Sequence, residues 1–267
     1  MGRNATQIVR CILISAVFLF SSANLLAQLQ SEPLVVSAEP ERLLTGRALR
    51  DALEERRSET SKGIPLRQAL QRLRMDTGIA IVLDRRIDPS RLVDASTEYV
   101  TTRNSISAYA KSAAASASFG DNVVAIGPAD ATARLRTLTT INRKSILSMR
   151  RTLAAELYRS LAKSHNWSWR DLTAPRQLIV QAAIDLGTTV DNPEIIPHDL
   201  WATVNLPPLT FVEFATLVLN QFDLNFEVTA DDTIRIVPGV ESVAIQQTHR
   251  VPSREKDTVV KRWQKDF

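Results

Sequence analysis

The sequence has few cysteines, histidines and glycines, and each shortage excludes a class of function. Its one cysteine is Cys11, and its three histidines are His165, His198 and His249. A zinc site needs several such ligands at short spacing, so no metal site and no disulfide is expected. Only eight glycines occur, and the glycine-rich phosphate-binding motifs are absent. The sequence therefore predicts no cofactor, and no hydrolase motif identifies catalytic residues.

Charge of one sign is not in large excess either. The chain has 33 basic and 29 acidic residues, for a formal net charge of +4. Proteins that bind nucleic acids concentrate lysine and arginine along one face, and no continuous basic stripe occurs here. We therefore expect no nucleic-acid partner.

Residues 1–27 have the pattern of a secretory signal peptide. A start containing Arg3 and Arg10 precedes an apolar run at 11–26, and Ala27 follows at a suitable cleavage position. The run is short for a transmembrane helix, which needs about 20 apolar residues. We therefore expect cleavage and a periplasmic or secreted protein, with membrane attachment only if the signal peptide is retained.

Two segments, 63–93 and 174–201, repeat one pattern at an offset of about 110 residues. The matched pairs are Pro65 with Pro175, Gly78 with Gly187, Pro89 with Pro197, and Pro128 with Pro238. A repeat of this length indicates duplicated domains, because solenoid repeats are much shorter.

Each copy predicts the order helix, strand, connecting segment, strand, helix and hairpin. In the first copy, apolar residues of 66–73 recur at helical spacing and 80–83 is a continuous apolar strand. In the second copy, Thr210 and Glu213 form a capping box before a helix with an apolar face. We therefore expect an α+β fold of two tandem small α/β sandwich modules, each preceded by a packing helix.

The domain boundaries follow from composition. Residues 129–142 are polar and rich in threonine, which is typical of a linker. A leading helix is expected at 41–57 for the first module, and leucines spaced by four predict a packing helix at 144–163 for the second. The expected organisation is a signal peptide (1–27), a linker (28–40), a first module with its leading helix (41–128), a second linker (129–143), a second module with its leading helix (144–240) and a C-terminal tail (241–267).

The run I-P-L-x-x-A-L-x-x-L-x-x-x-T-G-x-x-I-V-x-D, from Ile64 to Asp84, resembles the short N-terminal (STN) domain of secretins and TonB-dependent receptors. The second copy, through PEIIPHDLW, LPPLT and FDLNFEV, is similar to the divergent form of this domain in two-module exported proteins of planctomycete-type bacteria. The resemblance covers about residues 60–240. It implies a non-enzymatic adaptor or signalling module that contacts an envelope or outer-membrane protein.

The final strand of the second copy is one candidate binding site. It contains Thr233, Ile234, Arg235 and Ile236. At the edge of a sheet, such a strand can add a partner strand through main-chain hydrogen bonds. The alternative is that it lies in the centre of the sheet or is covered.

Trp167 and Trp169 form a second candidate. Two indoles at alternate positions can flank a sugar or a peptide, which would make the protein a binder of peptidoglycan or another carbohydrate. The alternative is that the tryptophans pack the preceding helix onto the second module.

The segment IPHDLW contains His198 and Asp199, the residue types of an acid–base pair, and so raises the alternative of a periplasmic hydrolase. No nucleophile accompanies them. In the repeat alignment they fall opposite Ser90 and Arg91, which indicates an outward-facing connector before Leu200 and Trp201 turn inward. We therefore expect an elbow between two strands rather than an active site.

Overall fold

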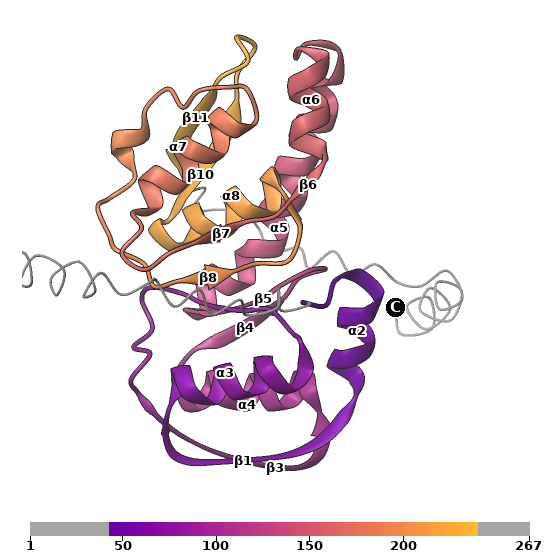
Figure 1. Cartoon of the computed structure of the whole chain (residues 1–267), viewed down its shortest axis with the longest axis vertical. Coiled ribbons are helices and arrows are strands. Elements are labelled where there is room, and N and C mark those ends of the chain that lie inside the picture. The colour runs from indigo at the N-terminus through magenta and orange to yellow at the C-terminus, as the bar shows by residue number, and fades with distance from the viewer. Residues whose placement is uncertain (1–42, 240–267) are drawn as a thin grey trace, which may run out of the picture. The chain divides into compact units, whose positions relative to one another are not determined.

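The structure, a computed structural model, describes residues 43–239 (Figure 1). The expected signal peptide (1–27), the linker (28–40) and the tail (241–267) lie outside the described residues. The fold is α+β, with helices and several small sheets. Within 43–239, no helix is both long enough and apolar enough to cross a membrane.

The first module places two helices between two small sheets (Figure 1). Its elements are α2 (Gly46–Glu54), β1 (Arg56–Pro65), α3 (Leu66–Thr77), β2 (Ile81–Leu83), β3 (Leu92–Thr101), α4 (Thr102–Ser112), β4 (Ser116–Phe119) and β5 (Val124–Gly127). β1 and β3 pair antiparallel. The other sheet has the order β2-β5-β4, with β2 parallel and β4 antiparallel to β5.

Local sequence explains where the helices of this module begin and end. α3 starts directly after Pro65, and its apolar residues at helical spacing are all buried. It ends at Gly78, which has a φ of 69°, a left-handed conformation that glycine adopts without steric cost. The Thr101 hydroxyl caps α4 by accepting a hydrogen bond from the Asn104 N–H.

The second module repeats this order, but two short strands stand in place of β1 and two more in place of β3. Its elements are β6 (Ser164–His165), β7 (Ser168–Trp169), α7 (Pro175–Asp185), a 3₁₀ turn (η2, Pro193–Ile195), β8 (Val204–Asn205), β9 (Leu209–Thr210), α8 (Phe211–Leu219), a 3₁₀ turn (η3, Asn220–Phe222), β10 (Leu224–Val228) and β11 (Ile234–Pro238). β6 pairs with β9 and β7 with β8, as β1 pairs with β3. Val190 bridges Ile234 in parallel, as β2 pairs with β5. The two copies therefore share one topology.

The capping box predicted at the start of α8 is present. The Thr210 hydroxyl accepts a hydrogen bond from the Glu213 N–H. In return, the Glu213 carboxylate accepts a hydrogen bond of 2.8 Å from the Thr210 N–H. Every residue of α8 except Glu213 is buried. A helix that is buried on all sides must pack against more than the core of its own module.

The predicted linker at 129–143 is wrong, because this segment lies in a long helix, α5 (Ala129–Ser148). α5 packs on β4 and β5 of the first module and on α8 and β10 of the second. Its polar residue Asn142 is buried, and the amide nitrogen donates to Thr216 Oγ1 and Asn225 Oδ1 at 3.0 and 2.8 Å. The polar side chain of Asn142 therefore belongs to a buried hydrogen-bond network and not to a solvated linker.

The two leading helices are shorter than predicted. α2 occupies only part of 41–57, and the arginines that follow it begin β1. The range 144–163 holds the end of α5, a 3₁₀ turn (η1, Met149–Arg151) and α6 (Ala155–Ala162). The leucines spaced by four are buried as expected, and α6 packs on α8.

The two modules share an apolar interface. Val82 and Ala125, on the β2-β5-β4 sheet, belong to the same buried cluster as α8. Polar contacts surround this cluster: the Asn122 amide donates to Glu213 Oε1 at 3.1 Å, and Arg86 donates to the Asn220 carbonyl at 3.2 Å. The first module therefore supplies the additional surface that buries α8.

Candidate functional site

The candidate binding strand, β11, lies in the centre of its sheet, which was the alternative to an open edge. β11 pairs with β10 on one side. On its other side Ile234 donates to the Thr189 carbonyl and accepts from the Asp191 N–H, at 2.9 and 2.8 Å. The Asn192 side chain then continues this edge by bonding both main-chain groups of Ile236. Thr233, Ile234, Arg235 and Ile236 therefore do not offer an open edge, because both sides of β11 are occupied.

His198 and Asp199 do not form an acid–base pair. Asp199 Oδ2 accepts from Arg85 Nε at 2.6 Å and from Trp201 Nε1 at 3.0 Å, whereas His198 is exposed. Burial opposes ionisation, but these hydrogen bonds outweigh it and hold the pKa of Asp199 below its ordinary value. The segment is an elbow as expected, although Leu200 points outward and is 51% exposed.

Trp167 and Trp169 take the packing role that was the alternative to a sugar platform. Their exposed fractions are 9% and 7%. Trp167 stacks on Phe214 with ring centroids 4.1 Å apart, and Trp169 contacts Trp201 and Phe214. Each indole N–H donates to a main-chain carbonyl, that of Leu209 or that of Ala202. The rings therefore offer little free face on which a sugar could stack.

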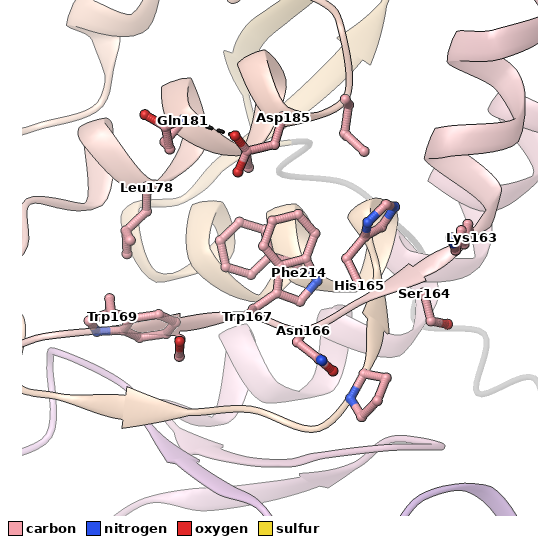
Figure 2. Close-up of a pocket in the computed structure, with 14 residues that line it drawn as sticks. Lys163, Ser164, His165, Asn166, Trp167, Trp169, Leu178, Gln181, Asp185 and Phe214 are labelled. Carbon is pink, nitrogen blue, oxygen red and sulfur yellow. Dashed lines mark hydrogen bonds between the residues drawn. The ribbon is translucent and has the colours of Figure 1, made fainter. Parts of the chain in front are cut away.

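A groove of about 510 Å³ nevertheless lies beside these tryptophans. One wall is the segment that contains β6 and β7, and the other is α7, as Figure 2 shows. The lining residues are Lys163, Ser164, His165, Asn166, Trp167, Ser168, Trp169, Leu178, Gln181, Ala182, Asp185, Leu186, Pro208 and Phe214. We call this the β6–β7 groove.

Strand alternation explains how one segment lines the groove with two kinds of side chain. His165, Trp167 and Trp169 occupy alternate positions, and Trp167 and Trp169 are buried while Asn166 and Ser168 are exposed. Opposite them, Leu178, Ala182 and Asp185 share one face of α7, because they are three or four residues apart. The walls match in length, at roughly 13 Å for five strand residues and about 10 Å for two helical turns.

The strand wall presents main-chain groups without a partner in the described chain. Trp167 pairs with Leu206, whose N–H donates to the Trp167 carbonyl at 2.9 Å. Main-chain groups in an antiparallel ladder alternate in direction, so those of Asn166 and Ser168 point away from β8 and β9. No hydrogen bond from these outward groups to another residue of 43–239 is formed. Within residues 43–239, this side of the segment is an open strand edge.

Sequence reasoning identified the tryptophans but missed the groove. The alternation from His165 to Trp169 is the feature that could have revealed a strand with one inward face. Gln181 and Asp185 gave no comparable indication, because on the sequence they are ordinary polar residues of a helix. Their position opposite the strand depends on how α7 packs.

The side chains of the described residues do not bring together three or more His, Cys, Asp or Glu residues that could hold a metal ion. The comparisons with known proteins are also negative: no family model, no curated protein and no solved structure matches this chain.

Proposed function

We propose that this protein is a non-enzymatic interaction protein of the cell envelope that binds an extended segment of a partner protein in the β6–β7 groove. The observation that carries the proposal is the open strand edge at Asn166 and Ser168 beside a groove with a helical second wall. An extended peptide can pair with such an edge while alternate side chains enter the groove. The helix α7 then contacts those side chains and selects among them.

The cellular setting rests on the N-terminal sequence. Residues 1–27 have the composition of a signal peptide, and the run from Ile64 to Asp84 resembles the STN domain of envelope proteins. Such domains are contact modules, so the proposed partner is an envelope or outer-membrane protein. The duplicated fold agrees with an adaptor that consists of two such modules.

A glycan fits the groove less well than a peptide. Carbohydrate sites usually stack a sugar on an exposed aromatic face, whereas Phe214 covers Trp167. A hydrolase fits less well again, because Asp199 is bound to Arg85 and Trp201 rather than to His198. Peptidoglycan binding therefore enters as a competing outcome of the experiment below.

The test is selection of peptides from a random display library on the purified protein, followed by affinity measurements with the Ser168→Pro variant. The Ser168 N–H points outward, so proline removes the donor without removing a ladder hydrogen bond. We expect selected peptides to lose at least roughly tenfold in affinity, as lost main-chain pairing with an edge strand implies. Thr60→Pro is the matched control, because Thr60 is an exposed residue of β1, the corresponding strand of the first module.

A second measurement does not depend on the variant folding. Methylation of alternate peptide nitrogens removes the donors that would pair with the edge and leaves the protein unchanged. Every second N–H of an extended peptide would point towards the edge. We expect methylation of these nitrogens to abolish binding and methylation of the intervening nitrogens to be tolerated. Equal tolerance of both, or retention of the protein by purified peptidoglycan in place of peptides, would overturn the proposal.

A further inference from the structure

The β6–β7 groove has a polar end and an apolar end. Asp185 lies at one end of the α7 wall, and Leu178 lies two turns away at the other (Figure 2). Ala182 lies between them. An extended segment in the groove therefore meets different chemistry at successive inward positions.

Of the residues at 43–239, Asp185 is the only acidic one that lines the groove. Its Oδ1 accepts from Gln181 Nε2 at 2.9 Å, which orients the carboxylate. No residue of 43–239 forms an ion pair with Asp185. Two basic side chains also line the groove: Lys163 makes no ion pair with a described residue, and His165 Nε2 bonds the Ser160 carbonyl. The carboxylate is thus held in place with capacity for a further donor.

Asp185 is also the last residue of α7. The carbonyl end of a helix carries a partial negative charge, which favours a cation near it. The carboxylate and the helix end therefore have the same sign of charge and attract the same kind of ligand.

We infer that the groove selects an extended segment that carries a lysine or arginine two residues away from an apolar side chain. The inference rests on the proposed function and names the chemistry of its ligand. Alternate residues of a strand point to the same side at about 7 Å spacing, which lies between the distances along α7 from Asp185 to Ala182 (about 4.5 Å) and to Leu178 (about 10 Å). The basic side chain then reaches Asp185 while the apolar one packs on Ala182 and Leu178.

The test measures the affinity of the protein for three synthetic peptides based on the sequences selected from the display library. The peptides differ at one position only, which is Lys, Gln or Glu. We expect the Lys peptide to bind best, and Asp185→Asn to weaken it about three- to fivefold, the range of a partly exposed ion pair. Asp185→Lys should reverse the order so that the Glu peptide binds best. Glu227→Gln, at an exposed acid on β10, is the charge control and should change nothing.

The outcomes separate the inference from the proposed function. If Ser168→Pro abolishes peptide binding but all three peptides bind equally and Asp185→Asn has no effect, the edge stands and the basic preference is wrong. If selection yields no peptide that depends on Ser168, both fail. A salt titration adds an independent check, since an ion pair to Asp185 requires that the preference for Lys decline as ionic strength rises.

Discussion

Arg85 of the first module and Asp199 of the second form an ion pair, with Arg85 Nε 2.6 Å from Asp199 Oδ2. The guanidinium also lies 4.8 Å from the ring centroid of Phe222, and the Arg85 N–H donates to Gln221 Oε1 at 2.9 Å. One residue thus makes three contacts with the second module. The carboxylate of Asp199, a residue type typical of acid–base pairs, therefore joins the modules instead.

Removal of this ion pair should loosen the contact between the modules without unfolding either of them. Both side chains are partly exposed, so we expect a coupling of about 0.5–1 kcal/mol between Arg85→Gln and Asp199→Asn in a double-mutant cycle. Urea unfolding of the four proteins measures it. The exposed pair of Arg47 and Asp51 on α2 is a suitable control with an expected coupling near zero. A coupling at 85/199 no larger than that of the control would contradict the role given to this pair.

The lowered pKa of Asp199 predicts a dependence of stability on pH. Burial alone would raise the pKa, but the bonds from Arg85, Trp201 and the Leu200 N–H lower it below the unfolded value. The ionised group therefore stabilises the fold above about pH 4, and this contribution is lost as pH falls through the folded pKa. We expect the stability difference between wild type and Asp199→Asn to shrink between about pH 4 and 2. A difference that stays constant over that range would mean that Asp199 is not preferentially ionised in the folded state.

Asn142 should be needed for the attachment of α5. Its amide bonds Thr216 and Asn225, and all three side chains are buried. Asn142→Ala leaves two buried groups without a partner, so we expect a loss of about 1–3 kcal/mol in unfolding free energy. Ser145→Ala, at an exposed position of the same helix, should be within roughly 0.5 kcal/mol of wild type. Equal stability of both variants would restore the description of this segment as a linker.

Gly187 tests whether the end of α7 depends on backbone conformation alone. Its φ is +80°, and a Cβ there would have no atom within 4 Å. Gly187→Ala should therefore cost about 1 kcal/mol through strain, without any clash. Gly187→Asn should cost less, because asparagine tolerates the left-handed region better. Thermal unfolding of the two variants provides the comparison, and an Asn variant less stable than the Ala variant would refute the explanation.

Tyr109 should make the first module sensitive to alkaline pH. The ring is buried at 2% exposure, and its hydroxyl lies 2.9 Å from Ser61 Oγ. Burial raises the pKa of Tyr109, so the folded state favours the neutral phenol, and its contribution to stability is lost as pH rises above about 10. Tyr109→Phe should remove this dependence and cost about 1 kcal/mol at neutral pH through the lost hydrogen bond. The stability of the variant and of wild type between pH 8 and 11 decides this, and parallel curves would contradict it.

Much of the fold could be predicted because its determinants act over a few residues. The repeat identified two modules, and the glycine at the end of α3 and the capping box of α8 marked helix boundaries correctly. α5 was not predicted because the apolar residues of its sequence do not gather clearly on one helical face, and polar residues such as Asn142 lie among them. Only the neighbouring helix and strand show that this polarity is buried and satisfied.

The sequence by itself determined the α+β class, the duplication and the ends of several helices, since periodicity, caps and positive-φ glycines are local properties. The tertiary structure decided the rest. β11 is central only because Thr189 and Asp191, more than 40 residues earlier, pair with its outer side. Asp199 bonds an arginine of the other module, and the β6–β7 groove exists because α7 lies opposite one strand edge. Pairing between distant segments depends on packing, which no short stretch of sequence specifies.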